Sequence, residues 1–346
     1  MCSGLRPVAT WRSAAWQRFF EFAAKPNAMT WVFALQLALP LIFIAWIAVA
    51  PPRSLGGFVI QALSTSTGLL ALGLTGIWLL PPWWTPYAFG GLLLLAMFIG
   101  LRRQPFASLL PSAADGWTVA ALFVVLGGAA VNQAAHAWAG RTPPSGKVVG
   151  LAFPLTSGTY LIVNGGSEIS VNAHLMTLDP AIPRFRAWRG QSYGVDFVEI
   201  DLFGRRAHGV QPSEPSAYFI YGAEVIAPCT GVVIAALDGL PDMQPPQADR
   251  EHMAGNHVLL RCSDADVLLG HFRPGSLRMA VGAQVRVGER IAEVGNSGNT
   301  GEPHLHIHAQ RPGSPGAPLS GDPLPIRFDG QFLVRGARVQ LPWKTR

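Results

Sequence analysis

Four long stretches without a charged side chain fill most of the first 140 residues, and they constrain the fold more than any other feature of the chain. An α-helix rises about 1.5 Å per residue, so about 20 apolar residues cross a hydrocarbon core of about 30 Å. We therefore predict an α-helical transmembrane region over residues 1–140. The predicted spans are residues 29–50, 58–80, 86–101 and 117–138. The second and third are separated by "PPWWTP", whose prolines and tryptophans suit a turn at the membrane interface.

The basic residues leave the orientation of these spans open. Several of them precede the first span and favour a cytoplasmic N-terminus. Four complete spans would then return the C-terminal half to the cytoplasm. Arg53, Arg102 and Arg103 would lie on the opposite side and weaken the bias. Either the N-terminus is outside or one segment does not span, so neither the number of spans nor the orientation follows from charge. The residues before the first span are Arg6, Arg12, Arg18 and Lys25.

The composition changes after a linker rich in proline, glycine and serine at residues 141–147. Beyond it, short runs of apolar and β-branched residues alternate with glycine turns, and no long amphipathic helix follows Gly140. Strands of this length separated by turns are typical of an all-β domain. We therefore predict an antiparallel β-sandwich or sheet over residues 148–346.

Two cysteines lie at the ends of two such runs. Cys229 begins "CTGVVIAAL" and Cys262 ends "HVLLRC". If these runs form an antiparallel hairpin, the start of one lies opposite the end of the other. A disulfide is then possible and would suit an oxidising exterior. Two free buried thiols are the alternative, and the sequence favours neither.

Charge excludes some classes of function. Charged residues make up only 13% of the chain, apolar residues 49%, and the formal net charge is +6. Nucleic-acid binding needs basic and aromatic residues gathered on one face. The loose group at Arg184, Arg186 and Arg189 is not such a patch, so we expect no nucleic-acid partner. The predicted spans contain no Asp, Glu, Lys or Arg, which gives a transporter little support.

Three histidines spaced two residues apart form the strongest chemical signal in the chain. His304, His306 and His308 lie in "GNSGNTGEPHLHIHAQ", residues 295–310. In an extended strand, side chains two residues apart project from the same face. Neutral imidazole is the commonest zinc ligand in proteins. The spacing therefore predicts a metal site on one face of a sheet.

Several motifs resemble those of the lysostaphin/LytM-type zinc peptidoglycan endopeptidases. They are "YGVDF", "YGAEVIAPCTGVV", "GNHVLL", "LLGHFRPGS" and "VGAQVRVGERIAEVGNSGNTGEPHLHI", and the resemblance covers roughly residues 170–312. It implies a LytM-type β domain, a Zn²⁺ cofactor and peptidoglycan peptide as the substrate. Carried over by position, it implies that Asp196 and His306 bind zinc and that His271 and His304 are catalytic.

The chain departs from the family at the third metal ligand. The family has histidine four residues before the aspartate, whereas Ser192 stands there in this sequence, and serine is a poor zinc ligand. Either His174 in "VNAH" supplies the missing imidazole, as in the Asn-x-His … Gln-x-Tyr-x-x-Asp arrangement of divergent relatives, or the site is degenerate. We predict that His174 is the third ligand. His308 is expected to have a supporting or structural role.

The sequence thus predicts a membrane-anchored zinc metallo-endopeptidase that hydrolyses peptide bonds of peptidoglycan stems or cross-links. The alternative is an inactive relative that binds peptidoglycan or activates another cell-wall hydrolase. Peptidoglycan lies outside the cytoplasmic membrane. We therefore expect a multi-pass protein of the bacterial inner membrane whose C-terminal domain faces the periplasm. Its expected partners are the lipid bilayer and peptidoglycan peptide.

Overall fold

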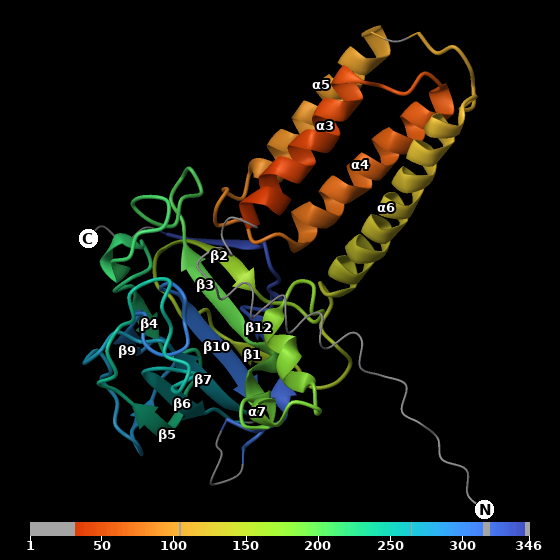
Figure 1. The fold of residues 1–346 in the computed structure, drawn as a ribbon. Helices are drawn as coiled ribbons and strands as arrows, with labels where there is room; N and C mark the ends of the chain where they lie inside the picture. Colours follow the sequence, from red (N-terminus) through yellow and green to blue (C-terminus); the bar gives the residue numbers. More distant parts are fainter. Residues whose placement is uncertain (1–31, 104, 264, 314–318, 343–346) are drawn as a thin grey trace, which may run out of the picture. The chain divides into compact units, whose positions relative to one another are not determined.

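A computed structural model describes residues 32–103, 105–263, 265–313 and 319–342 (Figure 1). The chain forms two compact units. Of the described residues, one unit contains residues 32–69 together with residues 88–124. The other contains residues 70–87 together with residues 125–342, which include the β domain.

Among the described residues, three helices are long and apolar enough to cross a membrane. A shorter apolar helix, Ala34–Val49, precedes them and corresponds to the predicted span 29–50, whose first residues lie outside the described part of the chain. Large apolar side chains on these helices, such as Leu63 and Leu94, are exposed, which is typical of a surface that faces lipid. The helices are η1 Ala34–Ala38, α3 Leu39–Val49, α4 Leu55–Thr75, α5 Thr85–Arg103 and α6 Ala114–Ala139.

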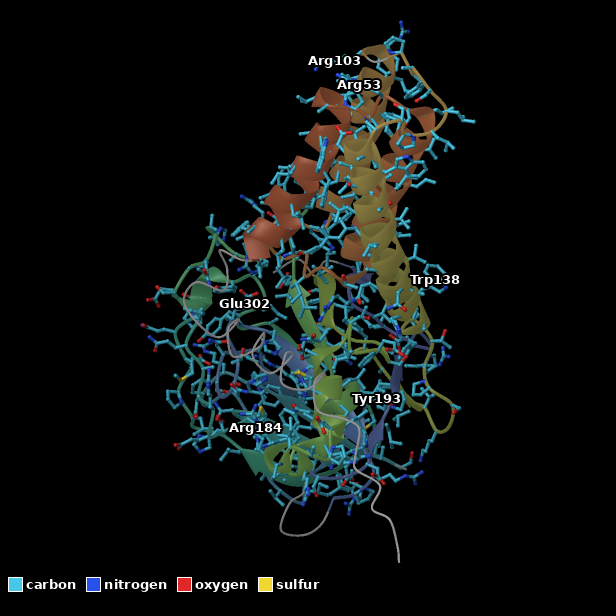
Figure 2. The ribbon with its side chains drawn as sticks, turned by 45° about the vertical axis from the view of Figure 1, so that its right-hand side comes forward. Arg53, Arg103, Trp138, Arg184, Tyr193 and Glu302 are labelled. Atoms are coloured by element: carbon cyan, nitrogen blue, oxygen red, sulfur yellow. A yellow bond between two sulfur atoms is a disulfide. The ribbon has the colours of Figure 1, made fainter. Side chains whose placement is uncertain are left out.

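Basic residues flank the helices of the first unit. Arg53 lies just before α4, and Arg103 ends α5 (Figure 2). Arg103 donates a hydrogen bond to the carbonyl of Ala48 at 3.4 Å, and the carbonyl of Arg53 accepts one from Ala107. Charged side chains therefore mark the ends of the apolar segments rather than their interiors.

The C-terminal half is a β domain, as the glycine-punctuated strand pattern predicts. Its main sheet has nine strands in the order β13-β2-β3-β10-β7-β6-β5-β8, with β11 also paired to β10, and every pairing is antiparallel. The strands are β2 Gly158–Asn164, β3 Val195–Glu199, β5 Gly231–Leu237, β6 His257–Arg261, β7 Asp266–Gly270, β8 Gln284–Val285, β10 Leu305–Gln310, β11 Pro323–Leu324 and β13 Arg338–Leu341.

Two small sheets and several helical turns complete the domain. Strands β4 Glu224–Ile226 and β9 Arg290–Glu293 pair antiparallel. Strands β1 Val149–Leu151 and β12 Ile326–Phe328 pair parallel and are the exception to the predicted antiparallel order. The turns are η2 Ala173–Leu178, α7 Pro183–Arg186, η3 Arg189–Tyr193 and η4 Pro215–Ala217.

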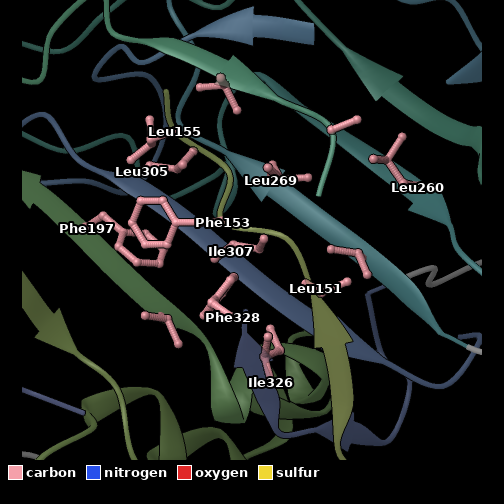
Figure 3. Close-up of a cluster of buried hydrophobic side chains, with 14 of the residues drawn as sticks. Leu151, Phe153, Leu155, Phe197, Leu260, Leu269, Leu305, Ile307, Ile326 and Phe328 are labelled. Atoms are coloured by element: carbon pink, nitrogen blue, oxygen red, sulfur yellow. The ribbon is translucent and has the colours of Figure 1, made fainter. Parts of the chain in front are cut away.

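The central strands bury both faces, and the two faces differ in chemistry. Phe197 of β3 and Leu305 and Ile307 of β10 point into the hydrophobic core, where they meet Phe153 and Phe328 (Figure 3). Because side chains alternate along a strand, the residues between them project from the opposite face. That face carries Asp196, His306 and His308.

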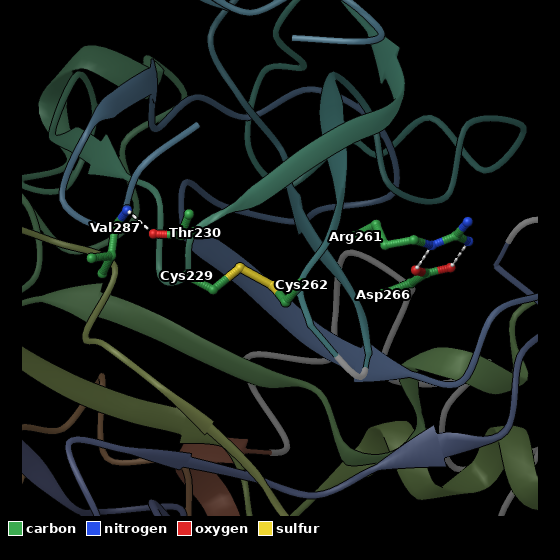
Figure 4. The surroundings of a disulfide bond; sticks show 6 residues. All are labelled: Cys229, Thr230, Arg261, Cys262, Asp266 and Val287. Atoms are coloured by element: carbon green, nitrogen blue, oxygen red, sulfur yellow. Dashed lines mark hydrogen bonds and ion pairs between the residues drawn. A yellow bond between two sulfur atoms is a disulfide. The ribbon is translucent and has the colours of Figure 1, made fainter. Parts of the chain in front are cut away.

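Strands β5 and β6 form the antiparallel hairpin that the two cysteine-bearing runs predict. Val232 lies opposite Arg261 in its register, and Cys229 and Cys262 join its ends in a disulfide (Figure 4). The structure thus contains the disulfide rather than two free thiols. Next to it, the guanidinium of Arg261 donates to both carboxylate oxygens of Asp266 at 2.8 and 2.9 Å.

Candidate metal centre

Strand register brings the first two candidate ligands together. Asp196 of β3 lies directly opposite His306 of β10 in the antiparallel ladder. Opposed residues of such a pair have Cβ atoms about 5 Å apart on the same face. The Nδ1 atom of His306 lies 2.8 Å from Oδ1 of Asp196. Both side chains are buried.

His174 reaches the same carboxylate from helical turn η2. Asn172 caps this turn, because its side-chain oxygen accepts the backbone N–H of His174. The same oxygen lies 3.0 Å from Nδ1 of His174, which leaves Nε2 as the nitrogen facing Asp196, 3.5 Å from Oδ2. The three side chains offer ligand atoms that all lie within 4.8 Å of one another.

Ser192 takes no part in this group. Its buried hydroxyl donates to the carbonyl of Arg189 at 2.7 Å and lies 2.7 Å from the hydroxyl of Thr177. The nearby Gly194 is required for a steric reason. A Cβ atom there would lie 2.7 Å from the ring of His306 and 3.3 Å from Nδ1 of His174, so glycine leaves room for both imidazoles.

His304 flanks the group immediately before β10. Its Nδ1 lies 2.9 Å from the carbonyl oxygen of Glu302 and 3.0 Å from the hydroxyl of Thr300. A carbonyl oxygen can only accept, so Nδ1 carries the hydrogen. The other nitrogen, Nε2, lies 3.7 Å from Oδ1 of Asp196 and is free to accept a proton.

His271 lies beside His304 in a rare backbone conformation. It follows β7 with φ of 64°, a left-handed value that costs a residue other than glycine about 1–3 kcal/mol. Buried hydrogen bonds hold it there, including one between Nδ1 and the carbonyl oxygen of Ser297 at 2.8 Å. Its ring centroid lies 4.7 Å from that of His304 and 5.9 Å from that of His306.

Burial sets the protonation states of the site. It lowers the pKa of His174 to about 4 and the pKa of His271 well below the usual range, so both rings are neutral at neutral pH. Burial also acts to raise the pKa of Asp196, but His174, His304 and His306 outweigh it and hold that pKa well below its usual range. Neutral imidazoles and an ionised carboxylate are the forms that bind a cation.

Two residues that the sequence analysis does not predict, Asn164 and Arg335, hold the Asp196 carboxylate in place through hydrogen bonds. The Asn164 amide donates to Oδ2 of Asp196 at 2.8 Å, and its oxygen accepts from the Arg335 guanidinium at 2.8 Å. Arg335 is buried, which lowers its pKa to about 10. Asn164 lies near Asp196 because of a register shift between β2 and β3, a feature without a sequence signal.

The structure therefore brings all five predicted site residues to one place. His174, Asp196 and His306 form the potential metal-binding group, and His271 and His304 lie next to it. No ligand role falls to Ser192, whose hydroxyl is bonded elsewhere.

Part of the chain is similar to known proteins. Residues 218–318 match the model of peptidase family M23. Among solved structures, the antimicrobial peptidase lysostaphin from Staphylococcus simulans is 20% identical over 36% of this chain and 40% of its own, with a TM-score of 0.24. A zinc-containing peptidase from Vibrio cholerae is 18% identical over 42% of this chain and 48% of its own, with a TM-score of 0.21.

Csd3 from Helicobacter pylori is 17% identical over 56% of this chain and 35% of its own, with a TM-score of 0.27. This chain thus spans less than half the length of each of these three structures. No curated protein matches the chain. The family match includes His271, His304 and His306, whereas His174 and Asp196 lie upstream of it. Residues 218–318 thus carry a domain that matches peptidase family M23.

Proposed function

We propose that this protein is a membrane-anchored zinc metallo-endopeptidase that cleaves peptide bonds in peptidoglycan stems or cross-links. One observation carries the proposal. His174, Asp196 and His306 offer three ligand atoms within 4.8 Å of one another, beside the paired imidazoles of His271 and His304.

The donor set fits zinc. Two imidazoles and one carboxylate are a usual protein contribution to a catalytic zinc site, which keeps a further position open. Each donor is also oriented by a neighbour: His174 by Asn172, Asp196 by Asn164, and His306 by His308. Such supporting hydrogen bonds are typical of true metal sites. A bound zinc ion would activate water and polarise the scissile carbonyl.

The two flanking histidines would move protons. In each, Nδ1 is held by a backbone carbonyl, Glu302 for His304 and Ser297 for His271. The remaining nitrogen, Nε2, of each ring can accept a proton and pass it to the leaving amine. Because the loops fix both rings before substrate arrives, little reorganisation is needed during the reaction.

The location of the protein is part of the proposal. The three long apolar helices of the described residues suit a multi-pass anchor in the bacterial inner membrane. The Cys229–Cys262 disulfide supports a β domain on the periplasmic side, because disulfides persist in oxidising compartments. Peptidoglycan is accessible from that side, and lipid and peptidoglycan peptide would be the partners.

The proposal is tested with the full chain purified in detergent. We expect about one zinc ion per chain and the release of new amino groups from purified peptidoglycan and its cross-linked stem peptides. Chelation should abolish this release, and added zinc should restore it. If the zinc-loaded chain binds peptidoglycan but releases no amino groups, the alternative of an inactive, binding relative replaces the enzyme.

A further inference from the structure

The turn after β3 exposes two large apolar side chains. Leu202 is 90% exposed and Phe203 is 65% exposed. The turn itself is well ordered by hydrogen bonds: the Asp201 carboxylate accepts the backbone N–H groups of Phe203 and Arg205 at 2.9 and 2.8 Å. Gly204 closes the turn with a φ of 77°. The fold therefore holds both apolar side chains outward.

This turn contacts the segment between α4 and α5. The indole N–H of Trp84 donates to the carbonyl oxygen of Phe203 at 2.9 Å. A Cβ atom at Gly204 would lie 2.6 Å from the ring of Trp83, so the turn packs closely on that ring. Arg338 of β13 lies 3.5 Å above the same ring. All these residues belong to the same compact unit.

The contacted segment has the features of a membrane interface. It joins two of the three apolar helices that are long enough to span, so it lies at the bilayer surface if they do. Trp84 is exposed at its end and Tyr87 is exposed in the first turn of α5. Tryptophan and tyrosine gather at the headgroup level of membranes. Trp138, in the last turn of α6, is also exposed, with Arg141 5.6 Å from its ring (Figure 2).

We infer that Leu202 and Phe203 insert into the interfacial layer of the bilayer that holds α4 and α5. This inference rests on the membrane anchoring in the proposed function. The occupant is lipid, because the apolar tip is continuous with the Trp83–Trp84 segment. Arg205 is exposed beside the tip, 5.6 Å from the Phe203 ring, and suits anionic headgroups. The β domain is thereby tied to the membrane at a second point besides its covalent linker.

Quenching of bimane fluorescence by nitroxide-labelled lipids tests, in the full chain, whether the Leu202–Phe203 turn lies in the bilayer. The Cys2→Ser protein, reconstituted in phosphatidylcholine–phosphatidylglycerol vesicles, would carry one bimane-labelled cysteine at a time. Leu202→Cys is the test position. Val281→Cys is a matched control, because Val281 is 63% exposed and lies just before β8, the sheet edge opposite β13. Leu94→Cys, 69% exposed on α5, reports whether the helices are in lipid.

We expect nitroxide-labelled lipids to quench Leu202→Cys and Leu94→Cys several-fold more strongly than Val281→Cys. If Leu94→Cys is quenched but Leu202→Cys is not, the insertion is wrong and the anchor stands. If neither is quenched, both proposals fail. Emission at position 202 that shifts to the blue with protein density, without quenching, would mean that a second copy covers the turn instead of lipid.

Discussion

The Nε2 atom of His306 lies 3.0 Å from Nδ1 of His308, two residues along the same strand. The other nitrogen of His306, Nδ1, faces Asp196 at 2.8 Å. Both nitrogens of one ring are therefore used, one toward the metal-binding group and one toward His308. If Nδ1 binds a cation, Nε2 must carry the hydrogen and donate it to His308. His308 then fixes the tautomer and the ring orientation of His306.

Replacing His308 should therefore weaken metal binding without touching a ligand. We expect His308→Leu to bind zinc about 10- to 100-fold more weakly, because the His306 N–H loses its acceptor. His308→Asn is the matched control, since its amide oxygen can take the place of Nδ1. Competition with a chromophoric chelator measures both. Wild-type affinity in His308→Leu, or equal loss in both variants, would contradict the positioning role.

The identity of the third metal ligand, His174 or Ser192, can be tested by substitution. His174→Ala should lose stoichiometric zinc, because it removes one of three donors. Ser192→Ala should keep zinc and lose only about 1 kcal/mol of stability, since its hydroxyl bonds Thr177 and a carbonyl instead. Metal analysis of the purified variants decides the matter. Full zinc content and activity in His174→Ala would remove His174 from the site.

The two histidines of "HLH" should behave differently. His306→Ala should lose zinc, because its nitrogen lies within the metal-binding group. His304→Ala should keep zinc and lose activity by about 100-fold or more, the usual worth of a general acid–base group. Zinc content and peptide cleavage are measured on the same preparations. Equal zinc loss in both variants would mean that these roles are wrongly divided.

The site residues that lie in short local motifs are predictable from the sequence, whereas those brought together from distant parts of the chain are not. A period of two predicts His304, His306 and His308 on one strand face, although His304 lies just before β10, and the motif "YGVDF" points to Asp196. The contacts of Asn164 and Arg335 have no such signal. They depend on a register shift between β2 and β3 and on a partner 171 residues away. Neither is encoded in local spacing.

The fold likewise has features that local sequence patterns predict and features that they do not. Uncharged runs and glycine turns predict apolar helices followed by an antiparallel β domain, and both are present. The parallel pairing of β1 with β12 is not predictable, because it joins the two ends of the domain. The outward Leu202 and Phe203 also give no clear pattern, since two apolar residues after a strand usually continue it. The hydrogen bonds of Asp201 and the positive φ of Gly204 show that they form a turn.

An ion pair between the buried Arg206 and the partly exposed Glu302 positions the loop that holds His304. Arg206 donates through Nε to both carboxylate oxygens of Glu302 at 2.9 Å, and the Glu302 carbonyl holds His304. Arg206→Lys keeps the charge but loses the Nε–H donor that both Glu302 oxygens share. We expect kcat to fall about fivefold, or ~1 kcal/mol, with zinc affinity unchanged. The control is Arg205→Lys, the exposed neighbour paired with Asp201, which should leave kcat unaltered. A drop in zinc affinity instead would place Arg206 in the metal site.

Acid should destabilise the metal-free protein, and His174 should account for part of the loss. Its folded pKa of about 4 lies below the ordinary value of 6.5, because burial disfavours the charged ring. Between these values the unfolded chain binds more protons than the folded chain, so stability falls as pH falls. The contribution of His174 is complete above the unfolded pKa and is lost toward pH 4, an effect of up to ~3.4 kcal/mol.

Hydrogen exchange of β3 and β10 peptides, in the EDTA-treated full chain with urea, would measure this loss. Each exchange rate is corrected for the intrinsic effect of pH. His174→Ala should show a shallower decline in unfolding free energy than the unaltered chain. An identical decline in His174→Ala would show that His174 is not buried as a neutral ring.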